Sequence, residues 1–319
     1  MNAKMVKSSI IAGVVTISAL FAAGSVSAAP KKFAGELAYQ HVQYLTEEIG
    51  PRVAGSENET KAREYIIDEL EKLDLKVEEQ EFSYTRGGKI TESANVIAVK
   101  DNKHTDKQII VGAHYDSVSV GKGADDNASS VGVILETAKA LEKRNLAYDI
   151  KYVFFGAEET GLQGSKYYAN NMSEEEIDNT IGMINLDSLL AGDNIYVYGG
   201  AGEDGWIRDL ALDIANKKNI PLETNSGINP EYPEGTTGDW SDHAPFKAKG
   251  ISIAYFEATN WELGDQDGYT QTEKHGEIWH TENDNLEFLE REFPGRVQEH
   301  LNHFTNMLTW VLADIKKEQ

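Results

Sequence analysis

Residues 108–113 have the sequence QIIVGA, and residues 152–156 have the sequence YVFFG. Both runs are short, apolar and rich in β-branched or aromatic residues, which predicts two strands buried in a sheet. Between them, residues 129–143 carry apolar side chains at helical spacing. A strand, a helix and a second strand in this order predict a parallel pair of strands connected by a helix.

The same alternation continues on both sides of this segment. Further apolar runs predict strands, and further periodic segments predict helices, the last of them interrupted near Pro294. No stretch has the composition of a linker between domains. The sequence therefore predicts a single α/β domain of three layers, with helices on both faces of a mixed, largely parallel sheet. The additional strands are expected at 76–84, 94–99, 181–186, 195–198 and 251–256, and the additional helices at 36–48, 58–73, 204–217 and 285–316.

The first 28 residues have the pattern of an export signal. Lys4 and Lys7 precede a mostly apolar stretch at 10–23, and small residues at Val26 and Ala28 flank Ser27. We expect a signal peptide at 1–28, cleavage after Ala28, secretion, and a mature domain at 29–319. The alternative is a membrane anchor, but a spanning helix needs about 20 apolar residues. Stable membrane insertion is therefore not expected.

The chain is acidic and has no cysteine. Its formal net charge is −23, which argues against nucleic acid as a partner because the phosphates would be repelled. An exported protein without disulfides must be stabilised by its core and by any metal ions that it binds.

Histidines and acids follow the carboxyl ends of the predicted strands, where open α/β sheets place their sites. Imidazole and carboxylate ligands suit zinc, and more carboxylates than one zinc ion needs suggest a pair of ions. The adjacent acids Glu158 and Glu159 are expected to point to opposite sides of an extended segment, so that one binds metal while the other acts as a general base. These motifs are HYDS at 114–117, ADDNAS at 124–129, EET at 158–160, NLD at 185–187, SDH at 241–243 and WHT at 279–281.

In this order the motifs resemble those of the M28 family of zinc aminopeptidases, and the resemblance covers nearly the whole mature chain. It implies a zinc exopeptidase fold and two zinc ions per chain. It also implies Glu158 as the general base, Asp116 as the partner that orients His114, and Ser241 in the same role for His280. The implied ligands are His114 and Asp187 on one ion, Glu159 and His280 on the other, and Asp126 as the bridge between them.

Two positions depart from the family pattern. Similar enzymes often have a tyrosine near the oxyanion, either directly before the last histidine or three residues before the Ser-Asp-His motif. Here these positions hold Trp279 and Gly238. The oxyanion donor is therefore open between zinc alone and a loop tyrosine such as Tyr232 or Tyr269.

The expected activity is the removal of the first residue from peptides with a free amino terminus. Two other zinc enzymes of similar fold remain as alternatives, a carboxypeptidase and a single-zinc glutaminyl cyclase. A carboxypeptidase needs a cation for the substrate carboxylate, and the sequence does not locate one. A third alternative, from another class, is a non-catalytic surface binding protein.

Other acids and histidines have simpler explanations. Asp125 is expected to be a loop acid, and His300 and His303 are expected on a solvated helix face. Residues 265–268, DQDG, resemble part of a calcium loop, but Leu263 and Lys274 occupy its first and last ligand positions. Additional calcium is therefore not assigned.

Overall fold

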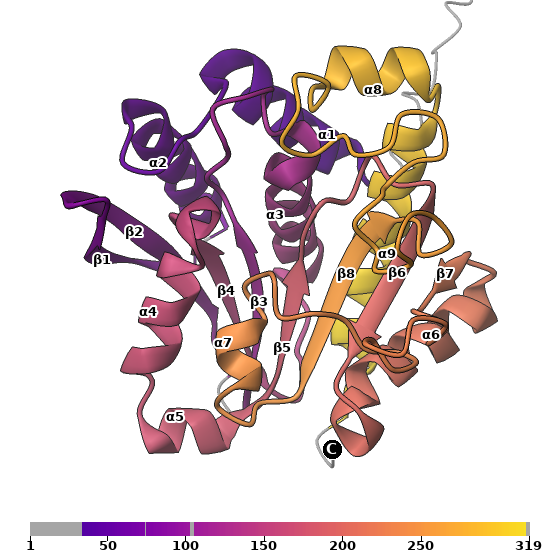
Figure 1. The fold of residues 1–319 in the computed structure, drawn as a ribbon. Coiled ribbons are helices and arrows are strands. Elements are labelled where there is room, and N and C mark those ends of the chain that lie inside the picture. Colours follow the sequence, from indigo (N-terminus) through magenta and orange to yellow (C-terminus); the bar gives the residue numbers. More distant parts are fainter. Residues whose placement is uncertain (1–33, 74, 103–104, 317–319) are drawn as a thin grey trace, which may run out of the picture. The chain divides into compact units, whose positions relative to one another are not determined.

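A computed structural model describes residues 34–73, 75–102 and 105–316 (Figure 1). The signal peptide expected at 1–28 lies outside these residues. Among the residues described, no helix is both long and apolar enough to cross a membrane. The strands are β1 (Lys76–Arg86), β2 (Lys89–Lys100), β3 (Gln108–His114), β4 (Asp149–Phe155), β5 (Thr180–Leu186), β6 (Asn194–Gly199), β7 (Leu222–Glu223) and β8 (Ile253–Thr259).

Helices precede, connect and follow these strands. The α-helices are α1 (Glu36–Gln43), α2 (Glu57–Glu71), α3 (Ser129–Leu141), α4 (Gln163–Asn171), α5 (Glu174–Asn179), α6 (Trp206–Lys218), α7 (Ala244–Lys247), α8 (Leu286–Glu292) and α9 (Arg296–Asp314). Helical turns of the π or 3-10 type are η1 (Tyr44–Ile49), η2 (Ala124–Ala128), η3 (Glu158–Thr160) and η4 (Gly202–Gly205).

The eight strands form one mixed sheet in the order β1-β2-β4-β3-β5-β8-β6-β7. Its centre is parallel, because β3 pairs in parallel with β4 and β5, and β5 pairs in parallel with β8. The pairs β1–β2, β2–β4 and β6–β8 are antiparallel. The predicted mixed, largely parallel sheet is thus confirmed, and the carboxyl ends of β3, β4, β5 and β8 lie along one edge.

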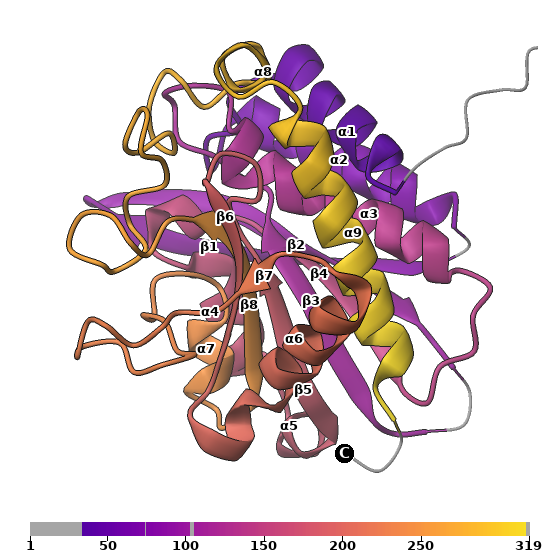
Figure 2. The same cartoon turned by 90° about the vertical axis from the view of Figure 1, so that its right-hand side faces the viewer.

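Apolar side chains of the central strands pack to both faces of the sheet. In β3, Ile109 and Val111 pack with α1, α3 and α9, while Ile110 packs on the opposite face with residues of α4 and α7. Figure 2 shows these two groups of helices with the sheet between them. The alternation follows from the period of two along a strand and produces the predicted three layers.

The last two helices are separated where the sequence indicated. After α8, Phe293 and Pro294 lead into Gly295, whose φ of 88° is left-handed and suits glycine. Proline cannot continue the hydrogen bonding of α8, so the chain turns and begins α9 at Arg296.

Candidate metal centre

Polar side chains gather at the carboxyl edge of the central strands. His114 ends β3, Glu158 and Glu159 lie just beyond β4, and Asp187 directly follows β5. A cavity of about 510 Å3 opens at this edge. It is lined by every residue expected to bind metal or act as the base, namely His114, Asp126, Glu158, Glu159, Asp187 and His280.

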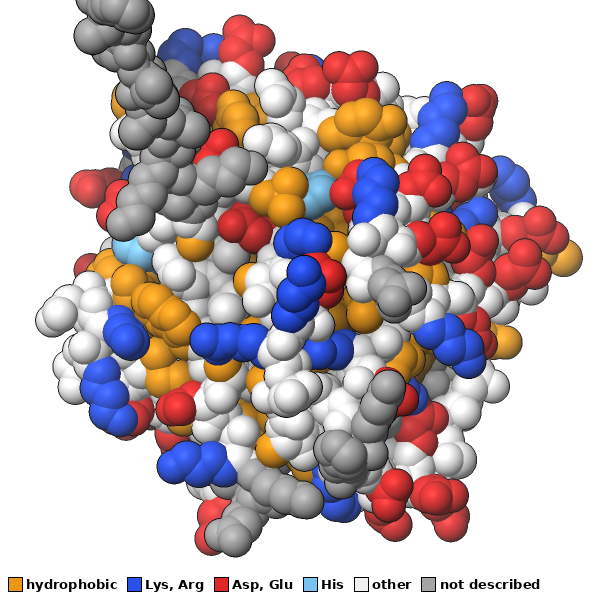
Figure 3. All heavy atoms as spheres, turned by 180° about the vertical axis from the view of Figure 1, so that it is seen from behind, with side chains coloured by type: hydrophobic (Ala, Val, Ile, Leu, Met, Phe, Trp, Pro, Cys, Tyr) orange, Lys and Arg blue, Asp and Glu red, His pale blue; other side chains and the backbone are white. Residues whose placement is uncertain are grey.

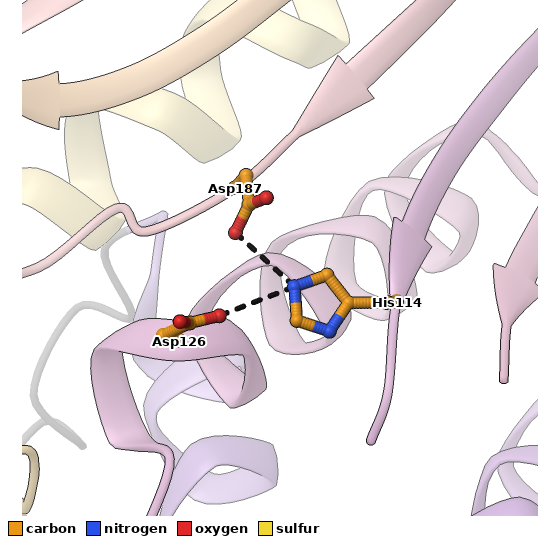
Figure 4. A group of neighbouring side chains, drawn as sticks. All are labelled: His114, Asp126 and Asp187. Atoms are coloured by element: carbon orange, nitrogen blue, oxygen red, sulfur yellow. Dashed lines mark hydrogen bonds and ion pairs between the residues drawn. The ribbon is translucent and has the colours of Figure 1, made fainter. Parts of the chain in front are cut away.

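The first ligand group lies at the base of the cavity. His114 Nε2 is 3.1 Å from Asp126 Oδ1 and 3.3 Å from Asp187 Oδ1, and all three side chains are buried (Figure 4). Figure 4 shows both carboxylates pointing at the same ring nitrogen. One imidazole nitrogen and two carboxylate oxygens at this spacing form a group that could hold a metal ion.

The second group shares one residue with the first. His280 Nε2 lies 2.9 Å from Glu159 Oε2 and 3.2 Å from Asp126 Oδ2. These atoms also lie close enough together to hold a metal ion. Asp126 therefore turns one carboxylate oxygen toward each group, which is the arrangement that a ligand bridging two ions requires.

The charges at the site are strongly coupled. Hydrogen bonds to Asp126 and Glu159 raise the pKa of His280 to about 11. Burial would raise the pKa of Asp126, but hydrogen bonds from His114 and His280 outweigh it and hold that pKa well below its usual range. Burial raises the pKa of Glu159 to about 7, and repulsion by Asp126 adds to the effect. Three carboxylates and two imidazoles within hydrogen-bonding distance match the donor chemistry of a zinc pair.

Glu158 and Glu159 diverge for a different reason from the expected one. They lie in the helical turn η3 rather than on extended backbone, because Ala157 has a φ of 56° and turns the chain. A turn of three residues places neighbouring side chains about 120° apart. Glu159 contacts His280, whereas the Glu158 carboxylate has no hydrogen-bond partner in the described part of the chain.

Asp116 joins the end of β3 to η3. Its Oδ1 lies 3.5 Å from His114 Nδ1, and its backbone oxygen lies 3.2 Å from the same nitrogen. Its carboxylate also accepts the N–H groups of Glu158 at 3.0 Å and Glu159 at 3.2 Å. Asp116 thus contacts the side of the His114 ring that faces away from the ligand group, as expected for a residue that orients it.

Ser241 contacts a different ligand from the one expected. Its Oγ donates to Asp187 Oδ2 at 2.6 Å and accepts from Asn185 Nδ2 at 2.8 Å. The expected contact with His280 is therefore wrong. Topology explains the difference, because the segment of Ser241 leads toward β8, and β8 pairs with β5, the strand that delivers Asp187.

Aromatic side chains form much of the remaining cavity wall. Trp279 and Trp240 line it, together with Tyr269, whose ring packs against Trp279 with centroids 4.8 Å apart. Tyr232 is not among the lining residues and packs against Trp240 instead. Of the two loop tyrosines considered as oxyanion donors, only Tyr269 is at the cavity.

A cation also lines the cavity. Lys166 lies on α4, is exposed, and donates from Nζ to the backbone oxygen of Gly161 at 3.0 Å. The sequence did not indicate it, because the polar segment of α4 was not predicted to be a helix beside the site.

Two further acids support the turn that carries Asp126. Asp284 Oδ1 accepts the N–H of Asp125 at 2.7 Å, and Asp284 Oδ2 accepts the N–H of Asp126 at 3.2 Å. Asp125 lies in the turn η2 between β3 and α3, and its side chain is fully buried. Burial raises the pKa of Asp125 to about 7, although three hydrogen bonds to its carboxylate oppose that rise.

Arg52 is a buried cation beneath the same turn. Its guanidinium donates to the backbone oxygens of Tyr115, Lys122 and Gly123 at 2.8, 2.9 and 2.8 Å. Gly123 has a φ of 60°, and a Cβ there would lie 2.7 Å from Arg52 Nη2. Arg52 therefore fixes the loop between His114 and Asp126.

The expected solvated face of α9 is wrong for His300. Its ring is buried, and Nδ1 lies 3.1 Å from the backbone oxygen of Leu189, while His303, one turn away, is partly exposed. The ring belongs to the packing between α9 and the segment after β5.

Comparisons with known proteins agree with this architecture. The model of peptidase family M28 matches residues 95–305. The alkaline phosphatase isozyme conversion protein of Escherichia coli K12 is 30% identical over 316 residues, which cover 89% of this chain and 91% of that protein. Aminopeptidase YwaD of Bacillus subtilis is 33% identical over 207 residues, which cover 63% of this chain but only 41% of that protein.

Solved structures share the fold. A zinc aminopeptidase from Bacillus subtilis has a TM-score of 0.71 at 21% identity, covering 90% of this chain and 97% of that chain. A glutaminyl cyclase from Porphyromonas gingivalis has a TM-score of 0.69 at 23% identity, covering 88% and 98%. The family match extends over more than half of the sequence and includes all the motifs of the site, and the chain therefore belongs to peptidase family M28.

Proposed function

We propose that this protein is a secreted zinc aminopeptidase that removes the first residue from peptides with a free amino terminus. The observation that carries the proposal is the position of Asp126, whose two carboxylate oxygens face His114 and His280 separately. Each of these histidines has a second carboxylate beside it, Asp187 or Glu159. This arrangement supports two zinc ions that share one bridging acid.

The chain's own residues then have distinct tasks in hydrolysis. Zinc held by these ligands would polarise the substrate carbonyl and lower the pKa of a water molecule. Glu158 accepts a proton from that water as its oxygen bonds to the carbonyl carbon. Glu158 then gives the proton to the leaving nitrogen as the peptide bond breaks. Its carboxylate suits this task because it lines the cavity and has no other hydrogen-bond partner in the part of the chain described.

The cavity's charge favours an amino terminus over an interior peptide bond. The cavity wall carries Asp239 and Asp267, acids outside the proposed zinc ligands, and their charge is complementary to that of a protonated α-amino group. Trp240, Tyr269 and Trp279 offer apolar contacts to the rest of the peptide.

Two alternative activities follow from particular observations. The fold is shared with a glutaminyl cyclase, which favours a single-zinc enzyme as the runner-up. Lys166 on the cavity wall offers a positive charge for a substrate carboxylate, as a carboxypeptidase requires. A binding protein without catalysis would not need the unpaired Glu158 carboxylate.

Three peptides and a metal measurement separate these activities. An aminopeptidase cuts a peptide that has a free amino terminus and an amidated carboxyl terminus, and leaves intact a peptide that has an acetylated amino terminus and a free carboxyl terminus. The reverse preference would indicate a carboxypeptidase, and ammonia release from an amino-terminal glutamine would indicate a cyclase. Elemental analysis of the gently purified protein should give two zinc ions per chain. A value near one that added zinc does not change would favour the cyclase.

Export is the remaining part of the proposal. The charged, apolar and small-residue regions of 1–28 support cleavage after Ala28, leaving one peptidase domain at 29–319. Amino-terminal mass spectrometry of a culture supernatant should find Ala29 first. Recovery of Met1 in the membrane fraction would show that the segment is retained as an anchor.

A further inference from the structure

Gln271 lies buried between two segments that carry proposed ligands. Its Nε2 donates to Asp125 Oδ2 at 2.6 Å, and its Oε1 accepts the N–H groups of Ile278 at 2.8 Å and Trp279 at 2.9 Å. The side chain is 1% exposed. Because both backbone groups are donors, they fix which end of the amide faces 278–279 and which faces Asp125.

Asp125 extends this connection to a third segment. Its Oδ1 accepts the N–H groups of Leu190 at 2.6 Å and Ala191 at 3.0 Å, shortly after Asp187 in the chain. Asp125 also directly precedes Asp126. One buried carboxylate and one buried amide therefore connect the segments that bear Asp126, Asp187 and His280.

The two ligand groups depend unequally on this connection. His114 is the last residue of β3, and Asp187 directly follows β5, so the sheet itself positions them. His280 lies in a turn outside the sheet, with a φ of 54° that non-glycine residues rarely adopt. Its ring is half exposed. The position of His280 therefore depends on how residues 278 and 279 are anchored.

We infer that Gln271 is a positioning residue that anchors the His280 segment to the Asp125–Asp126 turn and so sets the affinity of one zinc ion. The ion concerned is the one assigned to Asp126, Glu159 and His280, and the inference rests on the proposed two-zinc site. The other ion depends less on Gln271, because Asp284 and the N–H groups after Asp187 continue to hold the Asp125–Asp126 turn.

Gln271→Leu removes the connection, and Gln108→Leu is its matched control. Gln108 is also a buried glutamine with a side-chain hydrogen bond, from Nε2 to Thr180 Oγ1 at 2.8 Å. It begins β3, at the end of the strand opposite His114. Both substitutions remove a buried amide, but only Gln271→Leu removes hydrogen bonds next to the ligands, because Gln108 and Thr180 lie at the ends of β3 and β5 that are opposite to the site.

The readout is zinc affinity, measured by competition with a chromophoric chelator on metal-free protein whose folding is checked by thermal melting. Gln271→Leu should lower the affinity for one of the two zinc ions about 10- to 100-fold, which is the usual effect of losing a residue that supports a metal ligand. The affinity for the other ion should stay within about threefold of the wild-type value, and so should the affinities for both ions in Gln108→Leu. Unchanged constants in Gln271→Leu, or equal weakening of both ions, would overturn the inference. A wild-type protein that binds fewer than two ions would instead overturn the proposed function.

A charge exchange tests the hydrogen bond itself. In the double variant Asp125→Asn with Gln271→Glu, the new amide can donate to the new carboxylate, and the acceptors for Leu190, Ala191, Ile278 and Trp279 are all retained. Asp125→Asn alone brings two amide donors together, and Gln271→Glu alone brings two carboxylate acceptors together. Each single substitution should therefore weaken the binding of the ion. The double variant should restore its affinity to within about threefold, as expected for two directly coupled residues. A double variant as weak as the singles would refute the inference, even if Gln271→Leu does not fold.

Discussion

Glu158 and Glu159 are neighbouring carboxylates with different surroundings. Glu159 Oε2 lies 2.9 Å from His280, and Glu159 Oε1 accepts the N–H of Val118 at 3.1 Å, so both oxygens are engaged. Glu158 lines the cavity without a hydrogen-bond partner among the described residues. Because Asp116 binds the backbone N–H of both, the turn itself should be unaffected by a change in either side chain.

Glutamine at each position should therefore produce a different defect. Glu158→Gln keeps the shape but cannot accept a proton, so kcat should fall by about two to four orders of magnitude, while KM and the zinc content change little. Glu159→Gln presents a weaker neutral oxygen, so one zinc ion should bind more weakly and added zinc should partly restore activity. Kinetics and zinc stoichiometry of both variants measure this. Loss of metal in Glu158→Gln, with both ions retained in Glu159→Gln, would reverse the assignment.

Three of the proposed ligands, His114, Glu159 and Asp187, could be located from the sequence because they lie at or after the ends of apolar strands, whereas Asp126 and His280 were implied by the family resemblance. His114 and Asp187 need only the strand ends to be recognised, and the parallel pairing then brings them together. Gln271 and Asp284 could not be found in this way. They act through buried hydrogen bonds to backbone groups that are distant in the sequence, and no local periodicity encodes such a contact. The same limitation led to the wrong partner for Ser241, since its contact depends on which strands are neighbours.

At the level of elements, buried segments were predicted better than exposed ones. The strands β3, β4 and β5 are almost continuously buried, so their apolar runs identify them. The hairpin strand β2 begins at Lys89 rather than at the expected residue 94, and this start was missed because four of the residues 89–93 are polar. Helix α4, whose sequence is QGSKYYANN, has too few apolar residues for its period to be seen, yet it brings Lys166 to the cavity.

The back of the molecule shows a mixed surface of acids, bases and apolar side chains (Figure 3).

Helix α9 offers a pH-dependent test of its packing. Burial lowers the pKa of His300 to about 3, with Arg296 adding to the effect, whereas the unfolded value is 6.5. Below pH 6.5 the unfolded chain therefore binds a proton that the folded chain excludes, so stability falls as the pH falls. Between pH 7 and pH 5 this single group should remove about 2 kcal/mol from the free energy of unfolding.

His300→Gln removes that titration and retains a donor for the Leu189 oxygen. Its melting temperature should decrease less between pH 7 and pH 5 than that of the wild type. His303→Gln is the control on the same helix: burial also lowers the pKa of His303, but its ring is only partly buried, so this variant should differ from the wild type less than His300→Gln does. Parallel melting curves for His300→Gln and the wild type over this range would show that His300 is charged in the folded protein.

At the scale of the whole molecule, the proposed metal centre connects segments that are far apart in the chain. Its proposed ligands range from His114 to His280 in the sequence, and they lie on β3, η2 and η3, directly after β5, and in a loop. The sequence has no cysteine, so no disulfide can hold these segments together. Without a bound metal ion, Glu159 is repelled by Asp126, and Glu158 is repelled by Asp187 and Glu159. Folding and metal binding should therefore be coupled.

Removal of zinc should accordingly lower the melting temperature as well as the activity. An ion present at 100 times its dissociation constant stabilises the folded state by about 2.7 kcal/mol. In a domain somewhat smaller than this one, a loss of 1 kcal/mol in the free energy of unfolding lowers the melting temperature by roughly 2–4 °C. Loss of one zinc ion should therefore lower the melting temperature by about 5–10 °C, or slightly less in this larger domain. Zinc added back should restore the wild-type curve. Asp126→Asn lacks the shared ligand and should respond to chelator and zinc much less, which separates binding at the centre from any general effect of the chelator. If verified metal removal leaves the wild-type curve in place, the ligand segments are held by the protein alone, and Arg52, Asp284 and the sheet are sufficient to overcome the repulsion among the acids.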